Sequence, residues 1–471
     1  MQFLLVEDNP GVVSVFRDFA ASDSHVVEVV GDLESALAHI DAGPSGSDLV
    51  ICDLKIPSQP GSVDAEVEHG LMVLRRLLAR LPGVPVVVLS AFGTVDVVAG
   101  MLLEAKQLDV YGSGSPIPML RFEQKANVTA AMQSITDAHA ELNELDGIEL
   151  VGASDLDKEQ HRALRVFARR RGGRTVQYRP LSGGLSGAAT GLATVRSESG
   201  AQVAHVVAKL TRLSSALEER ERYRTYISGR LGAGTYADLS DEVLAGCQDG
   251  AGLFYSVADT YDKDLFTVLR LDEELAVRAV ERLVSDTSHW ISGAPQRSKM
   301  WVEVRELLIT PDKYEEVRSR YAIREVAEEK PIQTVWAAQH GDLHGANVLV
   351  DEAGRPVLID FGRTSYGPSL LDPITLELAV LFHPDSPYRD DAWPSVAALA
   401  DWNDLDSYLV GCPYPRFVRV CREWASRVGA GQRDLYAVVN AICLRNLRFK
   451  DVNSERALAL QEWAASVLDE S

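Results

Sequence analysis

Acidic side chains recur at positions where short apolar segments end, and this pattern suits a metal site built from oxygen ligands. Glu7 and Asp8 follow the apolar segment Phe3–Val6, and Asp53 follows Leu49–Cys52. Carboxylates gathered at one place repel one another unless a hard divalent cation lies among them, and Mg²⁺ prefers oxygen ligands of this kind. An aspartate held by such a cation can also accept a phosphoryl group, because the cation neutralises the charge that develops during transfer. We therefore expect the three carboxylates to bind Mg²⁺.

A second set of polar residues lies in the sequence His-Gly-Asp-Leu-His-Gly-Ala-Asn at 340–347. Within it, Asp342 can orient a substrate hydroxyl and take its proton, and Asn347 can turn back to a metal bound on a nucleotide. Asp360 ends the next apolar segment, in Ile-Asp-Phe-Gly, and can bridge that metal to the nucleotide phosphates. These residue types predict phosphoryl transfer from ATP·Mg²⁺, with Asp342 as the base and Asn347 and Asp360 as metal ligands.

The residues around the first carboxylates predict how the amino-terminal part of the chain folds. Short β-branched segments alternate there with amphipathic segments such as Val12–Ala20 and Leu33–Ala42, and this alternation indicates a parallel sheet covered on both faces. The expected strands are Phe3–Val6, Val26–Val29, Leu49–Cys52 and Val84–Leu89. In such sheets ligands bind at the carboxyl ends of the strands. Ser90 ends the fourth strand and adds a hydroxyl to the three carboxylates at that edge.

This layout resembles the response-regulator receiver domain over nearly the whole of residues 1–145. The resemblance implies that Asp53 is the phosphoacceptor, Ser90 the switch hydroxyl and Lys125 the phosphate-binding lysine. It also implies an upstream histidine kinase as a partner, and it leaves open a homodimer through the receiver. Two departures from the family pattern are an inserted loop at Ser58–His69 and an unusually long segment between Ser90 and Lys125.

Two helical segments connect this part to the rest of the chain. Val128–Leu142 is expected to be the last helix of the receiver, and Lys158–Arg171 a second helix that a glycine pair ends at 172–173. The triplet Arg169–Arg171 could contact nucleic acid. We expect it instead to pair with acidic groups of this very acidic chain, or to stabilise the helix C-terminus electrostatically.

Beyond residue 175 the pattern is typical of a nucleotide-binding lobe. A glycine-rich turn offers backbone N–H groups that can approach phosphate oxygens, at Ser182, Gly183, Gly184, Ser186 and Gly187. Lys209 lies in an apolar strand and needs an acidic partner, for which we select Glu219 in the helix that follows. Such a pair orients the lysine on the α- and β-phosphates of ATP. The apolar segment containing Tyr255 and Val257 is expected to hold the adenine through its backbone.

Together these motifs resemble the aminoglycoside phosphotransferase and choline kinase superfamily over roughly residues 175–471. Its H-G-D-x-H-x-x-N loop is intact here, and the resemblance implies that His340, His344 and Asp372 brace that loop. It further implies a protein-kinase-like fold with two lobes. The acceptor substrate is not indicated, because specificity should lie in the helical large lobe, where the sequence shows no substrate motif.

The expected architecture is an α/β receiver with a doubly wound parallel sheet (flavodoxin-like, as in CheY), followed by an α+β bilobal kinase-like domain. With 471 residues, 46% of them hydrophobic, the chain is long enough for more than one core. The expected parts are a receiver at 1–145, a helical connector at 146–175, a kinase-like small lobe at 176–258 and a helical large lobe at 259–471.

The composition of the chain limits which cellular locations and which binding partners are expected. The formal net charge of −21 repels phosphate backbones, so we expect no nucleic-acid partner. No segment approaches the ~18–20 apolar residues of a membrane-spanning helix, and the opening segment lacks the basic flank of a signal peptide. The five cysteines show no CxxC spacing, which is typical of reduced thiols. We therefore expect a cytoplasmic bacterial protein without a membrane partner.

The predicted function is two-component-type signalling in which phosphorylation of Asp53 regulates a phosphotransferase. That enzyme would use ATP as a substrate, bind Mg²⁺ as the receiver does, and act on an unknown hydroxyl acceptor. Two alternatives stay open. The kinase-like half could be an inactive, nucleotide-binding signalling scaffold, although the intact Lys209, Asp342, Asn347 and Asp360 argue against this. It could also transfer AMP rather than a phosphoryl group on the same fold.

Overall fold

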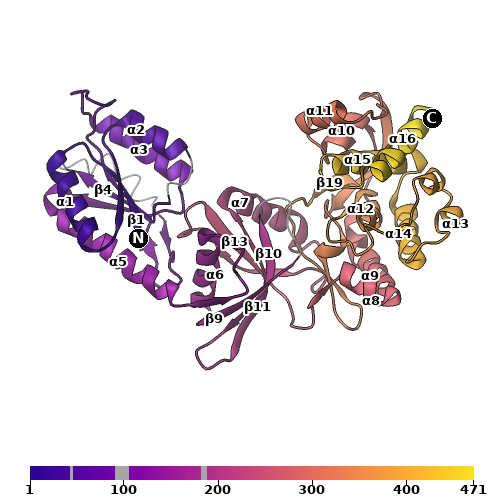
Figure 1. Ribbon diagram of the computed structural model, residues 1–471, viewed down its shortest axis with the longest axis horizontal. Coiled ribbons are helices and arrows are strands. Elements are labelled where there is room, and N and C mark those ends of the chain that lie inside the picture. Colours follow the sequence, from indigo (N-terminus) through magenta and orange to yellow (C-terminus); the bar gives the residue numbers. More distant parts are fainter. Residues whose placement is uncertain (43–45, 91–105, 182–187, 471) are drawn as a thin grey trace. The chain divides into compact units, whose positions relative to one another are not determined.

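The computed structural model describes residues 1–42, 46–90, 106–181 and 188–470 of the chain. These residues form two compact units. The first consists of Met1–Ala216 together with Leu239–Ser256, and the second of Leu217–Asp238 together with Val257–Ser471. Figure 1 shows a parallel α/β sheet and a mixed sheet in the first unit, and mainly helices in the second.

Five parallel strands form the first sheet, in the order β2-β1-β3-β4-β7. Their bounds are β1 Gln2–Val6, β2 Val26–Val30, β3 Leu49–Asp53, β4 Val86–Ser90 and β7 Leu120–Gln124. Strands β3 and β4 are buried along their whole length, as central strands covered on both faces should be. The four strands expected from the sequence are confirmed, each within two residues of the predicted bounds.

Helices cover both faces of this sheet (Figure 1). The bounds of the four helices are α1 Pro10–Ser22, α2 Leu33–Asp41, α3 Val67–Arg80 and α5 Val128–Asp146. The side chain of Asn9 caps α1 and that of Asp32 caps α2 through backbone N–H groups of the first turn. One apolar core includes residues of α1 and α5, and a separate one includes residues of α2 and α3. This is the doubly wound α/β class that the sequence predicted.

The long segment between β4 and β7 contains a small antiparallel hairpin. Its strands are β5 Gln107–Leu108 and β6 Ile117–Pro118. Val110 and Tyr111, between these strands, are buried in the core that also holds α1 and α5. The unusual length of this segment therefore supplies additional apolar surface to the unit.

A six-stranded sheet completes the first unit, in the order β12-β13-β11-β10-β9-β8. The bounds are β8 Glu149–Val151, β9 Thr175–Pro180, β10 Ala189–Arg196, β11 Gln202–Arg212, β12 Asp238–Val243 and β13 Gly250–Ser256. β8 runs parallel to β9, whereas β9, β10, β11 and β13 pair in antiparallel fashion. β8 lies in the segment expected to be a helical connector, so that expectation is incomplete. Three residues are too few to show a strand's alternation in the sequence.

Helix α6, Lys158–Arg170, joins the two sheets through one continuous apolar core. Asp157 and Gln160 start the helix with a capping box. On α6, Phe167 stacks on Phe254 of β13 with ring centroids 4.0 Å apart. The same cluster of buried side chains extends from Phe3 of β1 to Phe254. The receiver sheet and the six-stranded sheet therefore share a core.

The arginine triplet at the end of α6 pairs with acidic residues. Arg169 Nη1 lies 2.5 Å from Glu141 Oε2. Arg170 and Arg171 both pair with Asp241, each at 3.1 Å. The pairing with acidic groups that we expected from the sequence is confirmed.

The second unit is built mainly from helices that pack on two three-stranded sheets, β14-β17-β18 and β15-β16-β19. The helices are α7 Leu213–Arg222, which begins in the first unit, then α8 Leu265–Leu271, α9 Glu273–Ile291, α10 Trp301–Glu306, α11 Pro311–Arg320, α12 Leu371–Phe382, α13 Leu405–Tyr408, α14 Pro415–Val428, α15 Gln432–Leu447 and α16 Ser454–Glu470. The strands are β14 Lys263–Asp264, β15 Gln296–Met300, β16 Pro331–Gln339, β17 Val348–Val350, β18 Pro356–Leu358 and β19 Ser365–Pro368.

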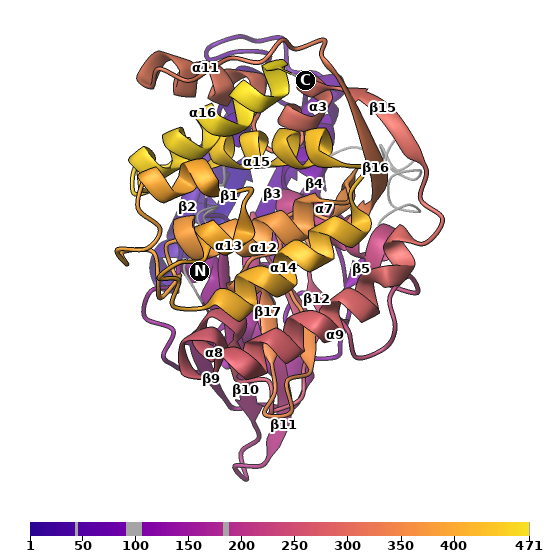
Figure 2. The same cartoon turned by 90° about the vertical axis from the view of Figure 1, so that its right-hand side faces the viewer.

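Figure 2 shows α9 and α14 side by side and α15 beside α16. Large aromatic side chains fill the space between the helices, and Trp301 and Trp402 are almost fully buried. None of the helices in the described ranges combines the length and apolar character that crossing a membrane requires.

Candidate functional site

The three carboxylates of the receiver meet at the carboxyl edge of its sheet. Glu7 follows β1 and is 1% exposed, Asp53 ends β3 and is 2% exposed, and Asp8 is exposed. One ligand atom from each lies within 4.8 Å of those of the other two. Ser90 is buried at the end of β4, the strand that pairs with β3.

Lys125 bridges two of these carboxylates from the end of β7. Its Nζ lies 2.7 Å from Glu7 Oε1 and 2.6 Å from Asp53 Oδ2. Burial raises the pKa of Asp53 although Lys125 lowers it, and burial likewise raises the pKa of Glu7, with a further contribution from the Asp53 charge. The positive charge of Lys125 therefore does not fully offset the cost of burying these two carboxylates.

The residues present fit a hard divalent cation. Within the described part of the chain, Glu7 Oε2 is buried without a hydrogen-bond partner, although its Oε1 accepts from Lys125 and from the Asn9 N–H group. An orphaned carboxylate oxygen beside two further carboxylates is an oxygen-only donor set, which Mg²⁺ prefers. Glu7, Asp8 and Asp53 are the residues that would hold it.

The second candidate site is the loop after β16, and a buried aspartate shapes it. The carboxylate of Asp372, on α12, accepts hydrogen bonds from the His340 N–H at 2.8 Å and the Gly341 N–H at 2.9 Å. His340 Nε2 contacts Ile359 O at 3.0 Å. Gly341 has φ 77°, and a Cβ there would lie 2.4 Å from Arg363 O, so only glycine fits this turn. These contacts position Asp342 next in the chain.

Asn347 closes the loop onto itself. Its Nδ2 donates to Asp342 O at 2.9 Å and lies 3.1 Å from His344 Nε2. The His344 ring lies 4.1 Å from the ring of His383, and burial lowers the pKa of His344. His344 is thus packed inside the loop. The remaining polar atom of the Asn347 side chain, Oδ1, is of the type that Mg²⁺ prefers.

Asp360 follows β18 and is held next to the loop by the backbone. The Ile359 N–H donates to Asn347 O at 3.1 Å. Asp360 itself has φ 63°, a left-handed conformation that is uncommon for non-glycine residues and is found more often at functional sites. The side-chain oxygens of Asp360 and Asn347 are of the type that Mg²⁺ prefers, and these two residues would hold a nucleotide-bound cation.

Two arginines contact the carboxylate of Asp342. Arg445 Nη2, from α15, lies 2.5 Å from Asp342 Oδ1, and Arg363 Nε lies 3.7 Å from Oδ2. Burial raises the pKa of Asp342, but Arg445, His344 and Arg363 lower it more, so the net shift is strongly downward. Asp342 is therefore ionised, and its negative charge is matched by cations before any substrate is present.

The nucleotide-binding residues expected from the sequence are distributed over both units. Lys209 lies buried in β11, Tyr255 is buried in β13 and Val257 follows that strand half-buried, while Glu219 is buried on α7. Ser182, Gly183, Gly184, Ser186 and Gly187 lie outside the described residues.

The helix that carries Glu219 is attached to the segment after Asp360. Arg222, at the end of α7, donates to Thr364 O at 3.2 Å, and the Tyr223 ring lies 5.4 Å from that of Phe361. A change in the position of α7 would therefore also displace the segment that carries Asp360.

Sequence reasoning missed Arg363, His383 and Arg445. Arg363 directly follows the Asp-Phe-Gly motif, and its position in the sequence could have indicated it. Arg445 is 103 residues from Asp342, with no motif to connect them. Only the packing of α15 beside the loop brings the two side chains together.

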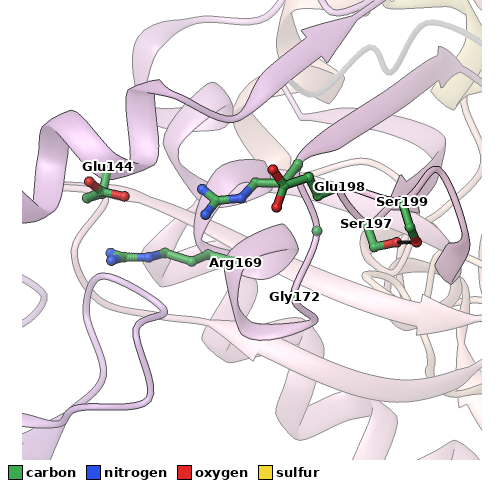
Figure 3. A pocket seen from close by; sticks show the side chains of 8 residues that line it. Glu144, Arg169, Gly172, Ser197, Glu198 and Ser199 are labelled. Atoms are coloured by element: carbon green, nitrogen blue, oxygen red, sulfur yellow. Dashed lines mark hydrogen bonds between the residues drawn. The ribbon is translucent and has the colours of Figure 1, made fainter.

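A cavity of about 710 Å³ lies elsewhere in the first unit and contains none of the predicted site residues. It is lined by Glu144, Arg169, Gly172, Gly173, Arg174, Ser197, Glu198 and Ser199. Its charged lining residues are Arg169, Arg174, Glu144 and Glu198. Arg169, labelled in Figure 3, is already paired with Glu141. Its charges balance, so it carries no sign of a specific ligand.

Solved structures resemble parts of the chain at low identity. The BeF3-activated N-terminal receiver domain of RstA from Klebsiella pneumoniae is 18% identical, with 30% of this chain and 97% of that chain covered and a TM-score of 0.22. The receiver domain of a sensor histidine kinase from Pseudomonas aeruginosa, with magnesium coordinated in its active site cleft, is 20% identical, with 28% and 94% covered and a TM-score of 0.20. The aminoglycoside phosphotransferase APH(3'')-Id from Streptomyces rimosus is 16% identical, with 61% and 93% covered and a TM-score of 0.31.

Family models match two separate parts of the chain. Residues 3–109 match the response regulator receiver domain, and residues 269–403 match the phosphotransferase enzyme family, APH. No curated protein matches the chain. The first match covers the strands that carry Glu7, Asp53 and Ser90, and the second covers the loop of Asp342. The chain therefore combines a response regulator receiver domain with a domain of the phosphotransferase enzyme family.

Proposed function

We propose that this protein transfers the γ-phosphoryl group of ATP to a hydroxyl acceptor, and that phosphorylation of Asp53 regulates the transfer. The observation that carries the proposal is the preformed loop around Asp342. Asp372 holds its backbone, and Asn347 is hydrogen-bonded within it at 2.9 Å. Positioning of this kind supplies most of the catalysis in phosphoryl transfer, because the protein contributes little covalent chemistry.

In the proposed reaction Asp342 accepts the proton of the acceptor hydroxyl. The hydroxyl oxygen forms a bond to the γ-phosphorus, the bond from that phosphorus to the β,γ-bridging oxygen breaks, and ADP leaves. Mg²⁺, held by Asn347 and Asp360, would neutralise phosphate charge. By analogy with kinases, Lys209 is assigned to the α- and β-phosphates and Glu219 to orienting that lysine.

Regulation is supported by how the receiver is joined to the six-stranded sheet within the first unit. Arg162 of α6 pairs with Asp48 of the receiver at 2.6 Å, and Gln248, between β12 and β13, donates to Asp48 at 3.2 Å. Arg170 of α6 donates to Asp109 O at 2.7 Å. These polar contacts surround the shared apolar core, so the receiver is packed against the lobe that carries Lys209.

Asp109 and Tyr111, which contact arginines of α6, lie between the two switch residues in the sequence. These switch residues are Ser90 and Lys125, and the hairpin of β5 and β6 also lies between them. A phosphoryl group on Asp53 would compete with the carboxylates for Lys125, and a shift of Lys125 or Ser90 would act on the contact between Asp109 and Arg170. Coupling between two such sites is typically about 1–3 kcal/mol, or roughly 5- to 150-fold.

Parallel incubations of the full-length protein with γ-labelled and α-labelled ATP test the proposed reaction. With Mg²⁺ and a panel of hydroxyl acceptors, label from γ-labelled ATP should appear in an acceptor and depend on Asp342. Acceptor labelled from α-labelled ATP would identify nucleotidyl transfer instead. Nucleotide binding without transfer to any acceptor would identify a scaffold, and either result would overturn the proposal.

A further inference from the structure

The arginines around Asp342 have no role in the steps of the proposed reaction. A general base needs a position from which it can accept a proton, yet one oxygen of Asp342 is in an ion pair with Arg445 at 2.5 Å and the other faces Arg363 at 3.7 Å. A carboxylate bound in this way is a weak base, because the guanidinium groups stabilise its charged form. Something that arrives with the substrate has to change this arrangement.

A third arginine, Arg448, directly follows the last residue of α15 and keeps helical backbone angles, φ −70° and ψ −23°. Arg448 follows Arg445 by three positions, and residues at that spacing on a helix are neighbours on its surface. Besides burial, the positive charge of Arg445 lowers the pKa of Arg448, and the negative charge of Asp342 raises it. Burial, and then the charge of Arg445, lowers the pKa of both Arg363 and Arg448. The three guanidinium groups therefore repel one another in a partly buried place.

The acidic groups near this cluster do not neutralise it. Those that act on Arg363 and Arg448 are Asp342, Asp360 and Glu316. Glu316 is 62% exposed and pairs with Lys313 at 2.8 Å, so solvent screens most of its effect. Asp360 is assigned to the cation of the nucleotide. Among the described residues, Arg363, Arg445 and Arg448 therefore face two largely unscreened carboxylates, Asp342 and Asp360, which leaves an excess of positive charge at this side of the loop.

We propose that the acceptor is an anion, a hydroxyl compound whose carboxylate or phosphate group binds Arg445 and Arg448. This inference rests on the proposed function and names its substrate class. The acidic group of the acceptor would take over Arg445, which frees Asp342 Oδ1 to receive the hydroxyl. Guanidinium groups match carboxylates and phosphates in geometry and charge. A cationic acceptor, such as an aminoglycoside, would be repelled by the same arginines.

Four pyranoses that differ in charge test the proposal: glucuronate, glucose 6-phosphate, glucose and glucosamine. Their binding to the full-length protein with MgADP is measured by saturation-transfer NMR, which does not require turnover. Glucuronate or glucose 6-phosphate should bind at least 10-fold more tightly than glucose, and glucosamine most weakly. The comparison of the two anions separates carboxylate from phosphate recognition. Glucosamine binding as tightly as the anions, or no binding of either anion, would overturn the proposal.

Variants of Arg448, just after α15, assign the effect to the arginine cluster. Arg448→Gln should weaken binding of the preferred anion roughly 10- to 150-fold, the range for hydrogen bonds to charged groups, and Arg448→Glu should abolish the preference for anions. The control is Arg427→Gln on α14, whose side chain is 65% exposed and whose loss should change nothing. If Arg448→Gln weakens ATP binding and leaves anion binding intact, the arginines serve the nucleotide and the proposal is wrong.

The two proposals fail in different ways. Anion binding that depends on Arg448, without label transfer from ATP to any acceptor, would retain the anion site and reject phosphoryl transfer. Label transfer to glucosamine in preference to glucuronate would retain phosphoryl transfer and reject the anion site.

Discussion

Replacing Asp48 by asparagine tests whether the receiver and the six-stranded sheet form one unit of stability. The Asp48 side chain is 3% exposed and lies just before β3. Its Oδ1 accepts from Arg162 at 2.6 Å and from Gln248 at 3.2 Å, and its Oδ2 accepts from the Gln2 N–H at 3.0 Å. One carboxylate thus connects the receiver, α6 and the segment between β12 and β13.

The expected cost follows from the burial of its partner. Removing the charge leaves the Arg162 guanidinium, 13% exposed, without its counter-ion. Breaking one side of a buried ion pair costs about 3–5 kcal/mol, and the lower value applies here because Gly246 O still accepts from Arg162. For a unit of about 150–250 residues each kcal/mol moves the thermal midpoint by roughly 2–4 °C. We therefore expect the midpoint to fall by about 6–12 °C.

Scanning calorimetry of the full-length protein at pH 7 measures this fall. The matched control is Asp146→Asn, because Asp146 also pairs with an arginine of α6, Arg165, at 2.5 Å, but is 71% exposed. Exposed pairs contribute about 0–1 kcal/mol. If Asp48→Asn moves the midpoint by less than 2 °C, or no more than the control does, the contact between receiver and sheet is not a cooperative part of the fold.

The same variant has a defined pH dependence. Burial raises the pKa of Asp48, but Arg162, the Gln2 N–H and Gln248 lower it more, so its pKa in the folded protein is below the usual value of about 3.9. A carboxylate with a lowered pKa in the folded state stabilises the fold fully at pH values above its pKa in the unfolded chain. This stabilisation is lost as the pH falls towards and through its pKa in the folded protein. The difference between wild type and Asp48→Asn should therefore shrink below about pH 4. An undiminished difference at pH 3 would contradict this reasoning.

Three further predictions concern the two sites. Acetyl phosphate with Mg²⁺ should label the full-length protein, and Asp53→Asn should abolish that labelling in intact-mass spectra; label retained in the variant would mean another acceptor. Asp360→Asn should remove most metal-dependent ATP affinity in calorimetry, whereas Asp342→Asn should leave affinity nearly intact and cut turnover by orders of magnitude; equal losses of affinity would refute these roles. Asp372→Ala should destabilise the second unit by about 3 kcal/mol, because two buried backbone N–H groups lose a charged acceptor; an unchanged midpoint would show that the loop does not depend on it.

Much of the receiver was predictable from the sequence because its information is local. Apolar segments followed directly by Glu7, Asp53 and Ser90 fixed the strands and the edge at which these residues lie. Helices α1 and α2 begin at the capping residues Asn9 and Asp32, a few positions after the strands β1 and β2 end. Strand β8 was not predictable, because its three residues are too few to show an alternation and its partner β9 lies beyond α6 in the sequence.

The contacts that the sequence did not indicate are long-range. Asp48 meets Arg162 and Gln248 across 114 and 200 residues, and Arg445 meets Asp342 across 103. No spacing rule connects side chains so far apart, since their meeting depends on how whole helices pack. The arginine triplet of α6 was predicted to pair with acidic groups, but which ones depended on tertiary structure.

The measurement that tests the central claim most directly is the rate of ATP turnover with and without beryllofluoride on Asp53. Full-length protein is assayed with Mg²⁺ and ATP. The Asp53→Asn variant is the control, because any change that beryllofluoride causes in its rate must arise at the nucleotide site and not at Asp53. We predict that beryllofluoride changes the rate by about 5- to 150-fold in the wild type, in either direction, and leaves the rate of the variant unchanged. Equal rates with and without beryllofluoride, while Asp53 is shown to be occupied, would contradict regulation of the phosphotransferase by its receiver.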